Sequence, residues 1–151
     1  MGQQPLQPGN PGFDPGLFTG DGLLRDTPRK ILVAEDNAVN QRIITILLEK
    51  LGLKALVVNN GMEAVEAVSQ YDFPVVLMDC HMPEMDGFEA TRAIRRMEAS
   101  SGKHTPIIAV TALAMAGDRE RCIEAGMDEY ISKPIHAEVL EQKLSRTAQA
   151  A

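Results

Sequence analysis

Three acidic side chains of this 151-residue sequence, Glu35, Asp36 and Asp79, lie at the ends of short apolar runs, as do Thr111 and Lys133 farther along the chain. If folding brings the three carboxylates within a few ångströms, they repel one another, and burial raises the cost of each charge. A bound divalent cation relieves that repulsion. Hard oxygen ligands without a cysteine or histidine pattern favour magnesium over zinc.

The lysine and the threonine extend this chemistry from a metal to a phosphate. Magnesium binds phosphate oxygens, and an ammonium and a hydroxyl group can pair with the oxygens that the metal leaves. Such a set suits a phosphoryl group held on or near a carboxylate. An aspartate can itself be the nucleophile, which gives an aspartyl phosphate. The protein then contributes mainly positioning and charge neutralisation.

The elements that must position these groups follow from the alternation of apolar runs and helical patterns. Short apolar runs predict strands at residues 31–34, 53–58, 74–78, 106–110 and 128–132. Helical spacing of apolar residues predicts helices around 39–51 and 64–68, and at 86–99, 117–125 and 135–147. Five strands alternating with helices predict an α/β fold, a doubly wound parallel sheet covered on both faces. In the third helix, Phe88, Ala90, Ile94 and Met97 are candidate core contacts.

Parallel sheets bind ligands outside the carboxyl ends of their strands. Glu35, Asp36, Asp79, Thr111 and Lys133 each end a predicted strand, so they should meet at one rim. Taken singly, each has a plainer explanation: Asp36 could cap a helix, threonine is common in strands, and most lysines are solvated. Their convergence favours the functional interpretation.

The chain divides into three parts. Residues 1–28 contain six glycines and five prolines and are predicted to be a flexible tail or linker. An alternative is that Leu17-Phe18 or Leu23-Leu24 docks on the domain or on a partner. Residues 29–147 form the predicted domain, and residues 148–151 a short C-terminal tail.

Composition excludes several classes of function. A net charge of −6, no tryptophan and 4% aromatic residues disfavour direct nucleic-acid binding. No apolar run is long enough for a membrane helix, and the N-terminus lacks the parts of a signal peptide. Two cysteines, Cys80 and Cys122, fit reduced thiols in the cytoplasm. No unexplained apolar stripe is present, so a monomer is expected.

Five segments closely resemble the receiver domain of two-component response regulators. They are ILVAEDN at 31–37, VLMDCHMP at 76–83, MDG at 85–87, IAVTA at 108–112 and YISKP at 130–134. The likeness covers about residues 29–147, in the order and spacing of the family. It implies a flavodoxin-like fold with strand order 2-1-3-4-5. The pattern Asn37-x-x-Asn40-Gln41 looks most like receivers attached to hybrid sensor histidine kinases.

The resemblance implies a role for each acidic residue. Asp79 would accept the phosphoryl group of a phosphohistidine. Asp36 and Asp79 would ligate Mg²⁺ directly, together with the backbone carbonyl of His81. Glu35 would hold a metal-bound water; many members have Asp at this position. The implied chemistry is limited to self-phosphorylation and autodephosphorylation of this one domain.

The resemblance also implies a switch. Lys133 would pair with the phosphoryl group, and Thr111, followed by Ala112, would form a hydrogen bond with it. The loop before Thr111 and the ring of Tyr130 would then shift together. Pro134 is expected to follow a cis peptide bond that aims Lys133 into the site.

The implied partner is a histidine kinase or a histidine-phosphotransfer domain. Its docking surface is predicted on the first helix, near Val39, Ile43 and Leu47, and on the rim loops; the same apolar residues could equally belong to the core. The chain would be the receiver of a hybrid kinase or, alternatively, a stand-alone regulator that acts by protein binding.

Two other classes fit less well. Phosphatases similar to haloacid dehalogenases usually place a second Asp two residues after the nucleophile, where this chain has His81. A nucleotide-binding module needs a glycine-rich turn, and the segment after the first strand has no glycine. Asp86-Gly87 indicates a turn and helix start. Arg92, Arg95 and Arg96 indicate a solvated helix face paired with Glu89.

Overall fold

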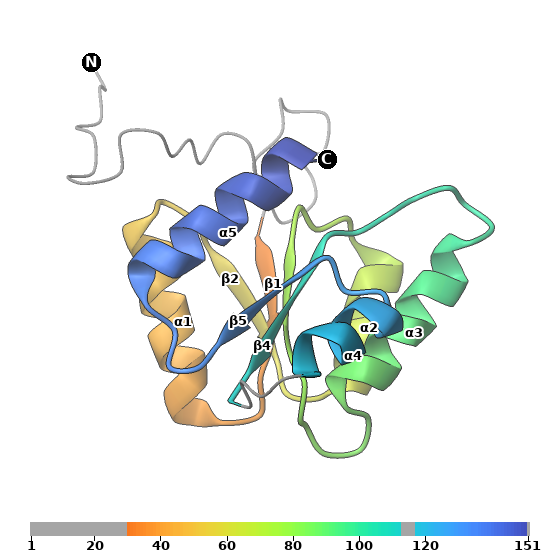
Figure 1. Ribbon diagram of the computed structural model, residues 1–151, viewed down its shortest axis with the longest axis horizontal. Helices are drawn as coiled ribbons and strands as arrows, with labels where there is room; N and C mark the ends of the chain where they lie inside the picture. The colour runs from red at the N-terminus through yellow and green to blue at the C-terminus, as the bar shows by residue number, and fades with distance from the viewer. Residues whose placement is uncertain (1–29, 113–116, 151) are drawn as a thin grey trace.

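A computed structural model describes residues 30–112 and 117–150 of the chain, and strands and helices alternate along them (Figure 1). The strands are β1 (Ile31–Ala34), β2 (Ala55–Val58), β3 (Val76–Asp79), β4 (Ile107–Thr111) and β5 (Glu129–Ser132). The helices are α1 (Ala38–Lys50), α2 (Gly61–Gln70), α3 (Gly87–Glu98), α4 (Asp118–Ala125) and α5 (Ala137–Ala150).

The strands form one parallel sheet in the order β2-β1-β3-β4-β5. Helices α1 and α5 cover one face of this sheet, and α2, α3 and α4 cover the other (Figure 1). The predicted doubly wound α/β fold and its strand order are therefore confirmed. Strands β1, β3 and β4 are buried along their whole length and form continuous apolar runs, which explains why the sequence revealed them.

Two apolar clusters, one on each face, form the core because successive strand residues point to opposite sides of the sheet. Leu32 and Ala34 of β1 pack in the cluster beneath α2, α3 and α4. Ile31 and Val33 of the same strand pack in the cluster beneath α1 and α5. Both clusters extend to the carboxyl ends of the strands, so the residues that follow the strands are attached to a well-packed core.

The start of α3 lies directly against the end of β3. Asp86 caps the helix: its side chain accepts a hydrogen bond from the Glu89 backbone, and Glu89 reciprocates. The Gly87 N–H donates to the Cys80 carbonyl at 3.0 Å. A Cβ on Gly87 would come within 2.2 Å of the Asp79 carbonyl oxygen, so only glycine fits. The predicted turn and helix start at Asp86-Gly87 is confirmed.

Several sequence-based details were wrong. Met97, predicted to contact the core, is 38% exposed. Helix α5 starts two residues later than predicted and runs to Ala150, beyond the expected end at residue 147. Arg95 does not pair with Glu89 on a solvated face; it is partly buried and bound to Glu98 and Asp128. Amphipathic spacing identifies a helix but leaves the edge of its buried stripe uncertain by one position.

Three further points complete the fold. The Lys133–Pro134 peptide bond is cis, as the resemblance implies. Among the described residues, no helix combines the length and apolar character needed to cross a membrane. The predicted tail at residues 1–28, with its alternative docking of Leu17-Phe18 or Leu23-Leu24, lies outside the described residues.

Candidate functional site

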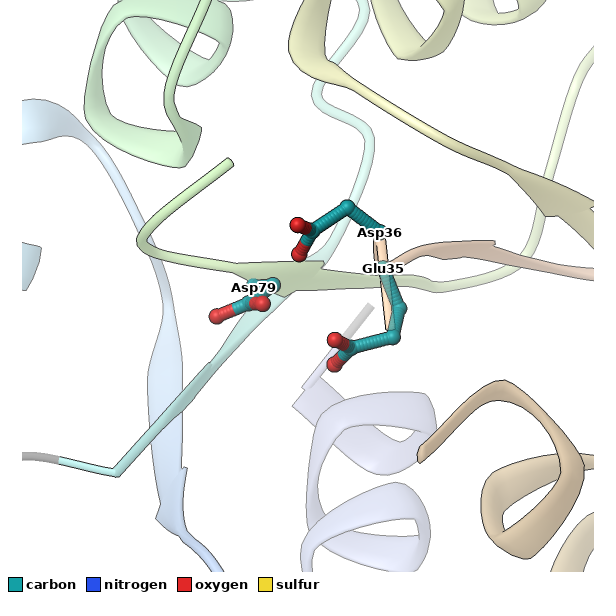
Figure 2. A group of neighbouring side chains, drawn as sticks. All are labelled: Glu35, Asp36 and Asp79. Atoms are coloured by element: carbon teal, nitrogen blue, oxygen red, sulfur yellow. The ribbon is translucent and has the colours of Figure 1, made fainter. Parts of the chain in front are cut away.

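The structure brings the three predicted carboxylates together at the carboxyl end of the sheet. Glu35 and Asp36 follow β1, and Asp79 is the last residue of the adjacent strand β3 (Figure 2). One oxygen from each carboxylate lies within 4.8 Å of the other two. Glu35 and Asp79 are buried, at 1% and 5% exposure, whereas Asp36 is exposed. The cluster therefore has a buried base and an open side.

The spacing and chemistry of these oxygens fit a small divalent cation. Magnesium binds oxygen ligands at about 2.0–2.1 Å, so opposite ligands lie about 4 Å apart. Three carboxylates within 4.8 Å of one another are close to that requirement. Among the residues that the structure describes, this is the one group of acidic, cysteine or histidine side chains arranged for a metal.

Lys133 provides the positive charge of the site. Its Nζ lies 3.0 Å from Glu35 Oε1 and 3.3 Å from Asp79 Oδ2, so the ammonium bridges the two buried carboxylates. Burial by itself would lower the pKa of Lys133, but the contacts with Glu35 and Asp79 outweigh it and raise that pKa. The lysine is therefore charged at neutral pH and faces the carboxylate predicted to be the nucleophile.

Opposing influences act on the pKa of the Asp79 carboxyl group. Burial, followed by the charge of Glu35, raises the pKa of Asp79 from 3.8 to about 6, although Lys133 and the His81 backbone act in the opposite direction. The His81 N–H donates to Asp79 Oδ1 at 3.3 Å. At pH 7 most of the Asp79 population is a carboxylate, which is the form that a nucleophile needs.

The two predicted switch residues lie on the strands beyond β3. Thr111 is the last residue of β4 and is buried, next to Ser132 of β5 in the sheet register. Tyr130 lies one strand farther, half-buried against the core cluster under α2, α3 and α4. Ala112 is exposed, and the segment that follows it, 113–116, lies outside the described residues.

Cys80 and Cys122 do not extend the site. Both thiols are free and buried, and burial raises the pKa of each above its usual range. A thiol kept protonated in this way is a poor nucleophile and a poor metal ligand. Both side chains instead pack in the apolar cluster beneath α2, α3 and α4.

The exposed face of α1 settles the question of core or surface for the predicted docking residues. Val39 is 67% exposed and Ile43 is 43% exposed, whereas Leu47 is half-buried and packs on the core cluster beneath α1 and α5. Ile43 and Pro134 line a small pocket of about 100 Å³ beside Lys133. An apolar patch on α1 thus continues up to the acidic cluster.

Sequence reasoning missed the polar residues that support Glu35. The Asn37 side chain caps α1 by accepting from the Asn40 N–H, and the Asn37 N–H donates to Glu35 Oε2 at 3.2 Å. Gln41 Nε2 donates to the Glu35 carbonyl oxygen at 2.6 Å and to Asn59 Oδ1 at 2.9 Å. The signal was present as Asn37-x-x-Asn40-Gln41, but the pattern alone does not say what these side chains contact.

Comparison with protein families gives a match over nearly the whole described domain. The model of the "Response regulator receiver domain" matches residues 31–145. Hybrid signal transduction histidine kinase I of Dictyostelium discoideum is 43% identical over 123 residues, which cover 78% of this chain and 7% of the relative. Sensor protein GacS of Pseudomonas syringae pv. syringae is 43% identical over 124 residues, covering 82% of this chain and 14% of the relative. The chain thus spans only a small part of these relatives.

Two solved structures share the fold. The receiver domain of sensor histidine kinase PA1611 from Pseudomonas aeruginosa PAO1 superimposes with a TM-score of 0.72 and 42% identity, covering 80% of this chain and 97% of that one. Its magnesium ion is coordinated in the active-site cleft. The receiver domain of Saccharomyces cerevisiae Ssk1, crystallised with the histidine phosphotransfer protein Ypd1, gives 0.73 and 28% identity, covering 80% and 90%.

Proposed function

This chain belongs to the response regulator receiver domain family, and on that basis we propose that Asp79 accepts a phosphoryl group from a phosphohistidine. The observation that carries the proposal is the setting of Asp79: a buried carboxylate at the end of β3, 3.3 Å from Lys133 Nζ and within a cluster of three acidic residues. An ion-paired aspartate kept for stability alone would not need two further carboxylates beside it.

The transfer needs little covalent chemistry from the protein. An Asp79 carboxylate oxygen forms the bond to phosphorus while the bond between phosphorus and the imidazole nitrogen breaks, and that nitrogen keeps the electron pair. The product is an aspartyl phosphate and a free imidazole. Hydrolysis by water later returns the carboxylate and releases inorganic phosphate. Lys133 Nζ stabilises the charge on the phosphoryl oxygens during both steps.

We propose that Mg²⁺ is the cofactor, held by Asp36, Asp79 and the His81 backbone carbonyl, with Glu35 holding a metal-bound water. The ion would neutralise the phosphoryl oxygens and the acidic cluster. Support comes from the oxygen-only donor set and its spacing, and from the magnesium in the similar PA1611 receiver.

The added phosphate gives the domain its switch. An aspartyl phosphate brings about two negative charges into a buried site, and Lys133 and the Thr111 hydroxyl are the groups proposed to meet them. Thr111 ends β4 and Tyr130 lies on the neighbouring strand β5, so a shift of Thr111 would alter the packing of the tyrosine ring. The surface of β4, α4 and β5 is therefore the proposed output face.

We propose a histidine-phosphotransfer domain or a histidine kinase as the partner. Its docking surface would be the exposed residues Val39 and Ile43 of α1 together with the rim loops, because both residues expose apolar area and Ile43 lines a pocket with Lys133. The complex of Ssk1 with Ypd1 supports a partner of this class. The domain is proposed to act as a monomer.

The wider context is also a proposal. The likeness to hybrid kinases favours the receiver of a hybrid histidine kinase, with residues 1–28 as the linker before it. Its proposed location is the cytoplasm, where a kinase meets ATP. A stand-alone regulator that acts by protein binding remains the second candidate.

The test is the intact mass of the protein after incubation with acetyl phosphate or phosphoramidate, with and without Mg²⁺. We expect a gain of one phosphoryl group that requires both Mg²⁺ and Asp79. Asp79→Asn should show no gain, and Asp72→Asn, which changes an exposed aspartate of similar chemistry, should behave as the wild type. A gain in mass that survives Asp79→Asn would overturn the assignment of the acceptor.

A further inference from the structure

We propose that Gln41 is a positioning residue for the acidic cluster: it fixes the Glu35–Asp36 peptide and thereby sets the affinity of the site for a divalent cation. This inference rests on the proposed function, since it concerns the same metal site. The hydrogen bonds that support it involve residues other than the predicted metal ligands. They link α1 and the loop after β2 to the end of β1.

Two short hydrogen bonds define the role of Gln41. Its Nε2 donates to the Glu35 backbone oxygen at 2.6 Å and to Asn59 Oδ1 at 2.9 Å. A carbonyl oxygen can only accept, so the amide nitrogen of Gln41, and not its oxygen, must face Glu35. Both hydrogens of the side-chain amide are thereby used, and the side chain is held in one orientation.

The Glu35 carbonyl is a sensitive point because the peptide bond is planar. Fixing the Glu35 oxygen fixes the plane that continues into the Asp36 N–H and Cα. The direction in which the Asp36 side chain leaves the backbone then depends only on rotation about the Asp36 N–Cα bond. Asp36 is exposed and has no core packing to hold it, so this peptide is its main anchor.

The Glu35 carboxylate is oriented separately but from the same turn. Its Oε2 accepts from the Asn37 N–H at 3.2 Å and from Asn40 Nδ2 at 3.5 Å, while Oε1 lies 3.0 Å from Lys133 Nζ. These contacts hold the side chain, whereas Gln41 holds the backbone. The backbone N–H of Asn37 and the side chains of Asn40 and Gln41 therefore all contact Glu35.

Asn59 anchors the other side of Gln41. The Asn59 N–H donates to Glu63 Oε1 at 2.7 Å, and the next residue, Asn60, caps α2 by accepting from the Glu63 N–H at 2.8 Å. The Gly61 N–H then donates to the Met85 carbonyl at 2.9 Å.

This path joins the loops after β1, β2 and β3, and Gln41 is its link to β1. The contact at Gly61 leaves no room for a side chain, because a Cβ there would approach the Met85 oxygen to 2.4 Å.

The chain of contacts predicts that loss of the Gln41 amide weakens metal binding and not only folding. Outer partners of metal ligands typically change metal affinity by about 10- to 100-fold when removed. Gln41→Met keeps the length and volume of the side chain but removes its donors, so we expect about a tenfold weaker affinity.

The experiment measures Mn²⁺ binding to the 151-residue protein from the electron paramagnetic resonance signal of the free ion, with Mg²⁺ as competitor. Gln142→Met, the same chemical change at an exposed position of α5, is the matched control and should bind as the wild type. The rate of phosphorylation by acetyl phosphate is measured in parallel. Raising Mg²⁺ should recover most of the rate lost in Gln41→Met.

Asn59→Ala provides the second variant, and it keeps the test decisive if Gln41→Met does not fold. We expect a smaller loss of affinity, and in the double variant a loss well below the product of the two single effects, because both act on one path. Equal affinities of wild type, Gln41→Met and Asn59→Ala would overturn the inference. If the wild type itself bound no Mn²⁺ or took up no phosphate, the proposed function would fail instead.

Discussion

Two groups of charged side chains, each with at least one buried carboxylate, lie at opposite ends of the same sheet, and their charges are balanced differently. The acidic rim, at the carboxyl ends of β1 and β3, consists of Glu35, Asp36, Asp79 and Lys133. The Arg95 network, before the starts of β4 and β5, consists of Arg95, Glu98, Thr105 and Asp128. The rim has three carboxylates for one ammonium, whereas the network has two carboxylates, Glu98 and Asp128, for the guanidinium of Arg95, and His104 also contacts Asp128.

The hydrogen bonds of the Arg95 network leave few groups unpaired. Arg95 donates to Glu98, to Asp128 and to the backbone oxygens of Thr105 and Gly126. The Thr105 N–H completes the pairing by donating to Glu98 Oε2 at 2.8 Å. The network thus joins the end of α3 to the segments that lead into β4 and β5.

Two carboxylates make the contrast measurable. Burial alone would raise the pKa of Glu98, but hydrogen bonds from Thr105 and Arg95 outweigh it and lower that pKa. Burial and the charge of Glu35 raise the pKa of Asp79 to about 6. Both side chains are more than nine-tenths buried, so burial itself does not separate them. The number and sign of their partners do: hydrogen bonds from Thr105 and Arg95 stabilise the Glu98 carboxylate, whereas Asp79 shares its one ammonium, Lys133, with the neighbouring carboxylate Glu35.

The largest expected effect is on stability at the Arg95 network. Arg95→Met should lower the free energy of unfolding by about 3 kcal/mol, because it leaves Glu98 buried without its cation. Arg92→Met, an exposed arginine of the same helix, is the control and should change little. Urea unfolding followed by far-ultraviolet circular dichroism measures both. A small change for Arg95→Met would mean that the network is not a stabilising element.

The corresponding change at the rim should act on chemistry. Lys133→Met should slow phosphorylation by acetyl phosphate about 100-fold at saturating Mg²⁺, since it removes the charged donor that faces the transferring group. Lys103→Met, at an exposed ion pair with Asp72, serves as control. The rate is followed by intact mass, and a folded Lys133→Met protein with a wild-type rate would contradict the role of the lysine.

Neutralising the two buried carboxylates should change stability with opposite signs. Above pH 6 the raised pKa of Asp79 costs the metal-free fold about 2–3 kcal/mol, so Asp79→Asn should stabilise it at pH 7.5. Between pH 6 and 3.8 the folded wild type binds the extra proton, and the difference should fade.

Glu98→Gln should instead lower the free energy of unfolding at pH 7.5 by about 1–2 kcal/mol. The lowered pKa of Glu98 means that this loss should shrink as the pH falls below the ordinary pKa of a glutamate. Thermal melts of the metal-free proteins across this pH range measure both variants. If Asp79→Asn and Glu98→Gln shifted the melting temperature in the same direction at pH 7.5, the proposed difference between the acidic rim and the Arg95 network would be wrong.

The smallest expected effect is at His81, beside Asp79. Its ring packs edge-on against Phe88, with centroids 6.2 Å apart, and is exposed at the mouth of the site. His81→Ala should change the lifetime of the aspartyl phosphate by about threefold, or ~0.7 kcal/mol, by altering the access of water. The decay of phosphorylated protein after removal of the donor gives the lifetime, with His104→Ala as control. Identical decay of His81→Ala and wild type would end this hypothesis.

The rim was predictable because its residues follow the strands directly. Glu35, Asp36 and Asp79 each end an apolar run, and parallel strands bring their carboxyl ends to one edge. The cis bond before Pro134 and the strand order came from the likeness to the family, and the structure agrees with both.

The Arg95 network was not predictable in the same way. Arg95 meets Gly126 and Asp128, about thirty positions away in the sequence, and no periodicity relates them. The helical pattern therefore indicated a surface position for Arg95. Met97 was assigned to the core for a related reason, since an amphipathic pattern does not show how far a neighbouring element extends over the helix.

The sequence by itself determined the alternation of strands and helices, the acidic rim and the family, because these depend on local spacing and on residues fixed to strand ends. Only the tertiary structure decided that Gln41 bridges Glu35 and Asn59, that Val39 and Ile43 are exposed, and that the pKa of Glu98 is lowered while that of Asp79 is raised. Each of these depends on which side chains from distant segments meet, and on how much water they exclude. A carboxylate has the same formula at both ends of the sheet, and its neighbours determine which one holds the fold together and which one is poised to react.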